Sequence, residues 1–304
     1  MTENWTVLKV LRWTSDYLDS KGVDNPRLDA ELLIGSALDK DRVGLYLCYD
    51  QPLLADELTH IHQLVARRAQ REPVQYILGQ TEFWSLKFEV SPSVLIPRGD
   101  SEILVEEALR LINGADSHSC DSVLDIGTGS GAIAIAIAHE FMHATEQRQL
   151  QVDAIDVSLQ ALQVARANAE HNAVGQRINF YQHDMAELNN FVTEHIEGGY
   201  GLIVSNPPYI SSAEMNDLMP EVSQHEPHLA LEAGEDGLDC YKLLSAQAMI
   251  ALQPLGWLAV EVGATQAQAV QHLFEQAGLS NIFTRTDYSG ITRVVGAQKT
   301  GSED

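Results

Sequence analysis

The sequence predicts an α/β protein in which a doubly wound, mostly parallel sheet follows a small N-terminal helical bundle. Residues 1–72 show helical periodicity, whereas from residue 122 onward short apolar strand patterns alternate with helical ones. Such alternation favours an open parallel sheet with helices on both faces. We therefore expect a helical domain over 1–72, a linker with a β-hairpin over 73–92, and an α/β domain over 93–304.

The first elements of the chain are predicted from amphipathic patterns and from the signals at their ends. One helix begins near residue 5, and a second covers 24–38, with Asp24 or Asn25 as its cap and Pro26 near the first turn. A third covers 55–71, with acidic residues early and basic residues late, as the helix dipole favours. Aromatic and β-branched residues over 81–97, with a turn near Ser85, predict the hairpin.

Five strands are predicted in the α/β domain, each followed by a helical pattern or a loop. These strands cover residues 122–126, 151–157, 178–184, 201–206 and 256–263. In an open sheet of this kind, ligands bind at the carboxyl ends of the strands. The residues that directly follow the strands are therefore the first candidates for a functional site.

Composition and charge restrict the class of protein. The formal net charge is −24, from 43 acidic and 19 basic residues, which opposes stable binding to nucleic acid. RRAQR (67–71) is the only dense basic cluster, and we expect it on a solvated helix face. The three cysteines are too few and too scattered for a disulfide framework, which favours a reducing compartment. With no signal peptide and no long apolar run, we expect a cytoplasmic protein that binds no membrane.

A glycine-rich loop follows the first strand of the α/β domain. In VLDIGTGSGAIAIAIA (123–138), Gly127, Gly129 and Gly131 allow a tight turn and a close approach of a ligand to the backbone. The helix that follows offers unpaired N–H groups at its start. Asp156 ends the next strand, where its carboxylate can accept hydrogen bonds from both hydroxyls of a ribose. These features predict a nucleoside cofactor and leave NAD and S-adenosylmethionine open.

The tetrapeptide Asn206-Pro207-Pro208-Tyr209 follows the fourth strand and decides between these cofactors. The side-chain oxygen of Asn206 and the carbonyl of Pro207 can accept the two hydrogens of a planar –NH2 group. The prolines have no N–H to compete and hold the carbonyl in place, and the ring of Tyr209 can stack on the group. A held –NH2 group suits in-line methyl transfer from S-adenosylmethionine, for which positioning matters more than a strong base.

With these motifs, the sequence resembles the HemK/PrmC family, the glutamine N5-methyltransferases that modify peptide-chain release factors. Residues 71–98, 225–244 and 286–295 also resemble family blocks. The resemblance implies the class I S-adenosylmethionine-dependent methyltransferase fold. It further implies methylation of the glutamine in the Gly-Gly-Gln segment of class-1 release factors, which the helical domain would recognise.

The resemblance also implies roles for single positions. The cofactor would contact Gly127, Thr128, Gly129, Ser130, Gly131, Asp156, Met185 and Asn206. The glutamine amide would be held by Asn206, Pro207, Pro208 and Tyr209. Met185 stands where the family often has an aromatic residue beside the adenine. At Gly99 the family usually has proline, and we expect a looser backbone there.

Several alternatives are weighed against this interpretation. A glutamine methyltransferase acting on a ribosomal protein, or an amino-methyltransferase acting on a nucleic-acid base, would use the same tetrapeptide. The acidic charge weighs against the second of these. His139 and His143 match H-E-x-x-H, but without a third ligand we predict no metal site. HEPH (225–228) is expected to shape the pocket near the tetrapeptide, and Glu261 and Tyr288 are interpreted as structural.

Overall fold

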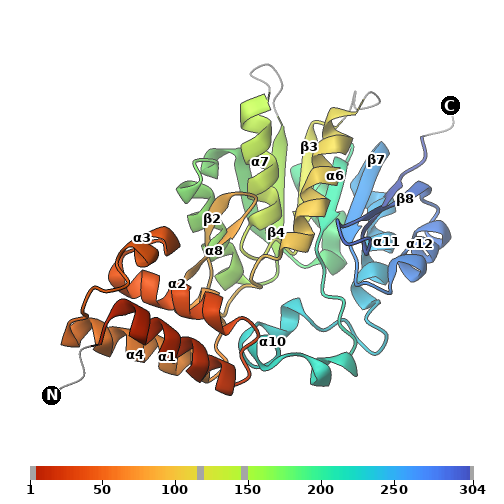
Figure 1. Ribbon diagram of the computed structural model, residues 1–304. Helices are drawn as coiled ribbons and strands as arrows, with labels where there is room; N and C mark the ends of the chain where they lie inside the picture. The colour runs from red at the N-terminus through yellow and green to blue at the C-terminus, as the bar shows by residue number, and fades with distance from the viewer. Residues whose placement is uncertain (1–4, 115–119, 145–149, 302–304) are drawn as a thin grey trace. The chain divides into compact units, whose positions relative to one another are not determined.

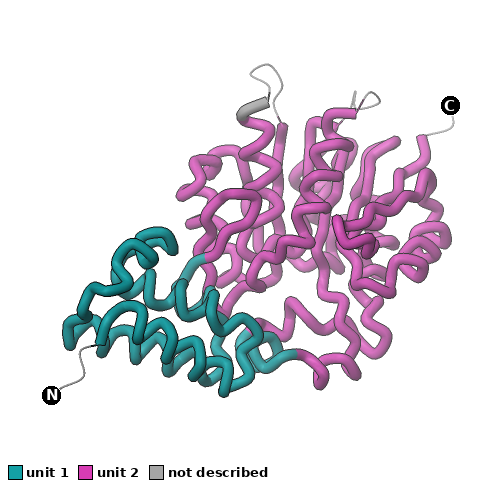
Figure 2. Tube along the Cα trace, in the orientation of Figure 1, with its two compact units in different colours: residues 1–80, 219–225 teal, residues 81–218, 226–304 magenta. Residues whose placement is uncertain are grey.

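The computed structural model describes residues 5–114, 120–144 and 150–301, and the chain divides into two compact units (Figure 2). Unit 1 comprises residues 1–80 together with 219–225, and unit 2 comprises 81–218 and 226–304. The domain limits predicted at residues 72 and 92 stay predictions of where independently folding regions end.

Unit 1 is helical, as the sequence predicts. Its helices are α1 (Val7–Ser20), α2 (Pro26–Leu38), α3 (Arg42–Leu47), α4 (Ala55–Ala69), α5 (Val74–Leu78) and α10 (Pro220–His225). The three longer helices match the predicted ones, and Pro26 is the first residue of α2, after Asn25 at the N-cap position. The three short helices have too few residues to show a helical period in sequence. Aliphatic side chains such as Leu11, Leu33 and Val65 form the core.

An ionic cluster of Asp29, Arg68, Arg71 and Glu221 joins α10 to the rest of unit 1. The Arg68 guanidinium donates to Asp29 Oδ2 at 2.6 Å and to Glu221 Oε1 at 2.9 Å, and Arg71 donates to Glu221 Oε2 at 2.6 Å. Arg68 is only 6% exposed, Asp29 6% and Glu221 8%. The expectation of a solvated face for RRAQR is therefore wrong for Arg68, because its two carboxylate partners bury it.

The predicted hairpin is present as a two-stranded sheet of β1 (Gln80–Phe83) and β2 (Leu86–Glu89). Trp84 and Ser85 connect the strands, and both have positive φ angles, 53° and 57°. Positive φ at both central residues characterises the two-residue turn whose twist matches that of the flanking strands. The predicted turn near Ser85 is confirmed.

Unit 2 is built on a seven-stranded sheet with the order β5-β4-β3-β6-β7-β9-β8 (Figure 1). Its strands are β3 (Ser122–Ile126), β4 (Gln151–Asp156), β5 (Ile178–Gln182), β6 (Tyr200–Ser205), β7 (Leu252–Glu261), β8 (Ser280–Thr286) and β9 (Thr292–Gln298). The first five are parallel and correspond to the five predicted strands. β9 runs antiparallel to both β7 and β8. Neither β8 nor β9 was predicted.

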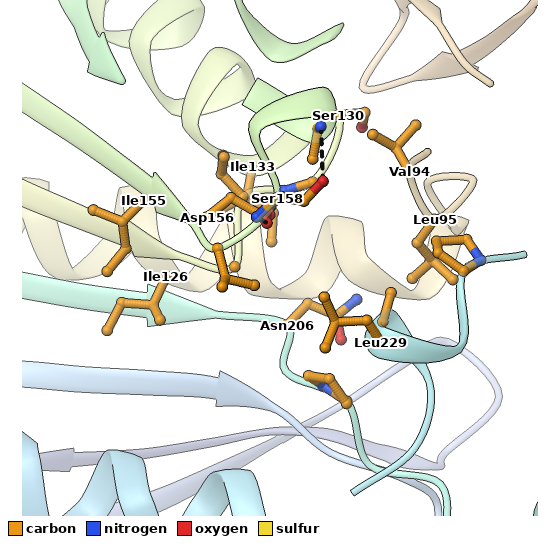
Figure 3. A pocket seen from close by; sticks show the side chains of 18 of the residues that line it. Val94, Leu95, Ile126, Ser130, Ile133, Ile155, Asp156, Ser158, Asn206 and Leu229 are labelled. Atoms are coloured by element: carbon orange, nitrogen blue, oxygen red, sulfur yellow. Dashed lines mark hydrogen bonds between the residues drawn. The ribbon is translucent and has the colours of Figure 1, made fainter. Parts of the chain in front are cut away.

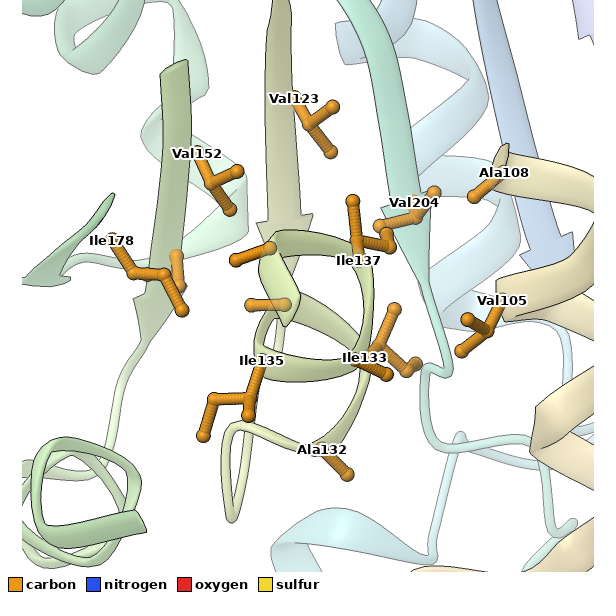
Figure 4. Close-up of a cluster of buried hydrophobic side chains, with 14 of the residues drawn as sticks. Val105, Ala108, Val123, Ala132, Ile133, Ile135, Ile137, Val152, Ile178 and Val204 are labelled. Carbon is orange, nitrogen blue, oxygen red and sulfur yellow. The ribbon is translucent and has the colours of Figure 1, made fainter. Parts of the chain in front are cut away.

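Helices cover both faces of this sheet. One buried cluster contains α6 (Glu102–Asn113), α7 (Ala132–Ala144) and α8 (Leu159–His171), and the other contains α9 (Leu188–His195), α11 (Asp239–Ala251) and α12 (Ala267–Gln276). Successive strand residues alternate between the clusters. Val123 packs in the first cluster, where Figure 4 shows it above α7, and Leu124 packs in the second. The doubly wound arrangement is thus confirmed.

The strand order brings three loops to one point of the sheet edge. The two halves of the sheet wind outward from the neighbouring strands β3 and β6, which creates a topological switch point. Ile126, the last residue of β3, pairs with Ile155 of β4 and with Ser205 of β6. The residues that come next on the three strands are Gly127, Asp156 and Asn206. They therefore lie together at the carboxyl edge.

Candidate active site

A cavity of about 400 Å³ opens in unit 2 at this edge. Its walls include eight of the predicted site residues, namely Gly127, Thr128, Gly129, Ser130, Asp156, Met185, Asn206 and Pro208. Figure 3 shows Asp156 at the end of β4 and Asn206 after β6, the two strands that flank β3, with Leu95 and Leu229 among the apolar side chains around them. Gly131, Pro207 and Tyr209 are predicted site residues that do not line this cavity.

The loop after β3 has a conformation that requires glycine. Gly127 and Gly129 have φ angles of 72° and 55°, and an added Cβ at Gly127 would lie in open space. The Thr128 hydroxyl donates to Asp125 Oδ2 at 2.6 Å, and the Ala134 N–H donates to the same oxygen at 3.3 Å. Asp125 is fully buried, which raises its pKa to about 7. Through these two hydrogen bonds, the Asp125 carboxyl group fixes the loop to the start of α7.

Gly131 has a packing role. A Cβ at this position would lie 2.9 Å from Ile135 Cδ1 and 3.1 Å from Ala165 Cβ, and its φ of 83° also favours glycine. The missing side chain lets the start of α7 lie against α8. In the sequence, a glycine needed for helix packing looks the same as one needed for contact with a ligand.

Asp156 combines support of the loop with a free acceptor surface. Its Oδ2 accepts the Gly129 N–H at 2.9 Å, and its Oδ1 accepts the Ser158 N–H at 2.8 Å. Burial raises its pKa, and the backbone N–H groups act in the opposite direction by stabilising the charged form. Each carboxylate oxygen has a second acceptor position, so Asp156 can also bind two hydroxyls of a ligand in the cavity.

Met185 lies beyond the end of β5, in the short 3₁₀ helix Met185–Glu187. Its side chain is partly buried against the second core cluster and also lines the cavity. A thioether offers a soft, polarisable surface on which a flat ring can pack. The departure from an aromatic residue at this position therefore preserves an apolar wall.

Asn206 is held by a residue that the sequence did not single out. Its Nδ2 donates to the Ser101 hydroxyl oxygen at 3.1 Å, which leaves Oδ1 as an acceptor. Ser101 is the last residue of a 3₁₀ helix over Gly99–Ser101, and a Cβ added at Gly99 would meet no neighbouring atom. Ser101 lies in the family-like segment IPRGDSE (96–102), but nothing in that segment singles out the serine, and the tertiary structure reveals its position.

The remainder of the tetrapeptide is divided between the cavity and the protein interior. Pro207 is buried, and Pro208 lines the cavity. The Tyr209 ring packs against the second core cluster, where burial raises its pKa to about 12. The Tyr209 carbonyl accepts Gln266 Nε2 at 2.8 Å. The packing of the Tyr209 ring and the hydrogen bond to the Tyr209 carbonyl thus hold the backbone after Asn206 in place.

The HEPH segment contributes to the same cavity, as expected. Pro227 and Leu229 line it, next to Glu226, which is buried. The Glu226 carboxylate accepts the Arg98 guanidinium and, at 3.4 Å, the Ile96 N–H. Burial raises the pKa of Glu226, and Arg98 opposes this shift by favouring the charged form. This ion pair connects the segment after the tetrapeptide with the segment before α6.

Two further observations concern metals and membranes. Within residues 5–114, 120–144 and 150–301, no group of three or more His, Cys, Asp or Glu side chains is arranged to hold a metal ion. The side chain of His143 lies outside the described residues. None of the helices in the described part of the chain is long and apolar enough to cross a membrane.

The chain matches two family models, described as the PrmC N-terminal domain over residues 9–79 and the methyltransferase small domain over 104–230. It is 47% identical over 296 residues to a release factor glutamine methyltransferase of Geobacter sulfurreducens, covering 97% of this chain and 98% of that one. A protein of the same name from Chlorobaculum tepidum is 38% identical over 291 residues, covering 95% and 96%. The crystal structure of the hMettl16 catalytic domain with an MAT2A 3′UTR hairpin has the same fold, with a TM-score of 0.54, 17% identity, and coverage of 79% and 83%.

Proposed function

This chain belongs to the release factor glutamine methyltransferase family, and from that premise we propose its substrate and the roles of its site residues. It transfers a methyl group from S-adenosylmethionine to the side-chain amide nitrogen, N5, of the glutamine in the Gly-Gly-Gln segment of class-1 release factors. One observation carries the proposal. The glycine loop follows β3, Asp156 ends β4 and Asn206 follows β6, and the register of these neighbouring strands brings all three to the border of one cavity.

The residues around the cavity fit the cofactor. Asp156 has free acceptor positions for the ribose hydroxyls, the glycine loop leaves the backbone accessible, and Met185 offers a surface for adenine. S-adenosylmethionine supplies an electrophilic methyl group: the bond from carbon to the glutamine nitrogen forms as the carbon–sulfur bond breaks, and the nitrogen releases one proton to water.

The tetrapeptide holds the substrate amide. Asn206 Oδ1 and the Pro207 carbonyl accept the two N–H hydrogens of the glutamine, and Tyr209 flanks the flat amide group. Because Asn206 Nδ2 is engaged with Ser101, its oxygen is the atom that remains for the substrate. Holding both hydrogens directs the nitrogen lone pair toward the methyl group, which lowers the barrier through orientation and electrostatics.

We also propose that the N-terminal region, residues 1–72, recognises the release factor, and that the enzyme acts in the cytoplasm, where translation ends. The net charge of −24 opposes stable binding to nucleic acid and supports a protein substrate.

A methyl-transfer assay with labelled S-adenosylmethionine tests the proposed function. Its acceptors are a purified class-1 release factor, the same factor with the Gly-Gly-Gln glutamine replaced by alanine, ribosomes, and DNA. We expect label on the intact factor alone. Label on ribosomes or DNA would overturn the substrate while leaving the –NH2 chemistry in place.

Replacing Asp156 is expected to weaken cofactor binding before it affects anything else. Asp156→Ala removes a charged acceptor, and hydrogen bonds to charged groups contribute about 1.5–3 kcal/mol, so the Kd for S-adenosylmethionine should rise roughly 10- to 100-fold. Isothermal titration calorimetry measures this change directly.

The matched control for Asp156 is Asp236→Ala, since Asp236 is exposed and, among the described residues, its side chain pairs with Lys242 and accepts the Leu238 N–H. That variant should bind the cofactor like the wild type. An unchanged Kd in Asp156→Ala would remove Asp156 from the cofactor site.

A further inference from the structure

Behind Asn206 lies a buried carboxyl group that the mechanism above does not use. Glu261 is the last residue of β7 and is 2% exposed. The side chains of Ser101 and Asn206 face it closely enough to stabilise its charged form. Its Oε2 has no hydrogen-bond partner among the described residues. A buried polar atom without a partner costs free energy, so its retention beside the proposed substrate-binding amide calls for an explanation.

The charge state of Glu261 decides which way the amide of Asn206 points. An ionised carboxylate can only accept hydrogen bonds, so it attracts the Asn206 NH2 group and the Ser101 hydroxyl hydrogen. Asn206 Nδ2 also donates to Ser101 Oγ at 3.1 Å. With both N–H hydrogens directed inward, Oδ1 is left to accept from a substrate in the cavity.

Protonation of Glu261 removes this preference. A neutral carboxyl carries one O–H donor, which can be satisfied by the oxygen of Asn206. The amide can then turn over and present its NH2 group to the cavity, where the glutamine –NH2 group also donates. Two donors that face each other cannot form the hydrogen bond that holds the substrate.

We propose that ionised Glu261 is a positioning residue that, together with Ser101, orients the Asn206 side chain so that its oxygen faces the substrate amide. This inference rests on the proposed function, because it explains how the same site selects an –NH2 group. Glu261 does not itself touch the reacting atoms.

Charged and titratable groups from several elements face Glu261. Burial raises its pKa to about 7, and nearby Asp100 acts in the same direction. Arg293 on β9 opposes the shift, although it is also paired with Asp100 at 2.7 Å and with Asp287 at 2.9 Å. The hydroxyls of Tyr209 and of Tyr241 on α11 complete the surroundings. Methyl transfer should therefore fall as the pH drops through about 7, because Glu261 becomes protonated.

The first test is the pH profile of kcat. Between pH 6 and 8 the ionised fraction of a group with this pKa rises about tenfold, and wild-type kcat should follow it. In Glu261→Gln, kcat at pH 8 should be at least roughly tenfold lower, and the rise near pH 7 should be absent. Since the pKa of Asp125 is also about 7, the loss of the rise in this variant is what assigns it to Glu261.

Two variants complete the set. Glu107→Gln makes the same change at a buried glutamate on α6 that pairs with Arg110 and Arg285, and it should keep the wild-type profile. Ser101→Ala removes a group that lowers the pKa of Glu261, so its midpoint should move to higher pH. If Glu261 had a purely structural role, the rise of kcat near pH 7 would persist in Glu261→Gln, and its midpoint would not move in Ser101→Ala.

A second readout is independent of activity. In the full chain, the side-chain ¹⁵NH2 resonances of Asn206, assigned with Asn206→Asp, should titrate with a midpoint near pH 7 in the wild type and stay constant in Glu261→Gln. If Glu261→Gln does not fold, the upward shift of the midpoint in Ser101→Ala takes its place.

The outcomes separate the two proposals. Wild-type enzyme that labels no release factor would contradict the proposed function, and the titration of Asn206 would then decide the inference alone. An Asn206 resonance that does not titrate in the wild type, or a Glu261→Gln enzyme with wild-type kcat and pH profile, would overturn the positioning role.

Discussion

Replacing Asn206 with alanine is expected to lower kcat for release-factor methylation by roughly 100- to 1,000-fold, the range for removing one group that is aligned with the transition state. The Kd for S-adenosylmethionine should change only a few-fold, because Asp156 and the glycine loop are left intact. Single-turnover transfer of labelled methyl groups and calorimetry of cofactor binding measure the two quantities separately.

A matched control is Asn189→Ala, which removes an exposed asparagine side chain on α9 away from the cavity. This control should methylate at the wild-type rate. If Asn206→Ala methylates equally well, the assigned mechanism fails, since nothing else in the site offers its side-chain oxygen at this position.

Replacing Arg68 with alanine is expected to give the largest loss of stability, about 3–5 kcal/mol, confined to unit 1. The substitution leaves Asp29 without its cation in a buried position and leaves Glu221 with Arg71 alone. Removing one member of a buried ion pair costs this much because the remaining charge stays desolvated. Hydrogen exchange measured by mass spectrometry on peptides of α2, α4 and α10 reports the local free energy of opening.

The control for Arg68 is its neighbour Arg67, whose side chain is 46% exposed and pairs with Glu72. Arg67→Ala should cost no more than about 1 kcal/mol, as expected for a solvent-exposed pair. The deficit of Arg68→Ala should also shrink as the pH falls, because the loss of the cation raises the pKa of Asp29 and protonation then removes the buried charge. Equal exchange in both variants would show that the ionic cluster contributes little.

Much of the fold is predictable because it depends on local patterns. β3, β4 and β6 are buried along nearly their whole length, and helical patterns separate the five parallel strands, which makes these strands visible in the sequence. The last two strands have weaker patterns. Most residues of β8 are only half-buried, and its partner β9 lies between β7 and β8 against the order of the chain.

The candidate site was predicted to the extent that its residues directly follow strands. Gly127 and Asn206 directly follow β3 and β6, and Asp156 is the last residue of β4. The register of the three strands brings these residues together. Ser101 carries no such signal, because it lies outside the sheet. Glu261 is the last residue of β7, but the predicted strand ran on to residue 263, and the meaning of a single glutamate comes from the group that it faces.

Arg68 illustrates the same limit for stability. A run of basic residues on a helix is usually solvated, and the prediction followed that rule. The partners that bury this side chain, Asp29 and Glu221, stand 39 and 153 residues away along the chain. Local charge patterns contain no information about contacts at such separations.

The position of α10 in the chain has a consequence for the order of events during synthesis. Residues 219–225 belong to unit 1, although the chain on either side of them belongs to unit 2. A ribosome that has delivered the first 80 residues has therefore not yet supplied the last helix of the unit that they build. Domains usually fold in the order in which they emerge. Here the ion pair between Arg68 and Glu221 cannot form until Glu221 has left the ribosome, when most of unit 2 has already been translated. Until then unit 1 is only partly formed.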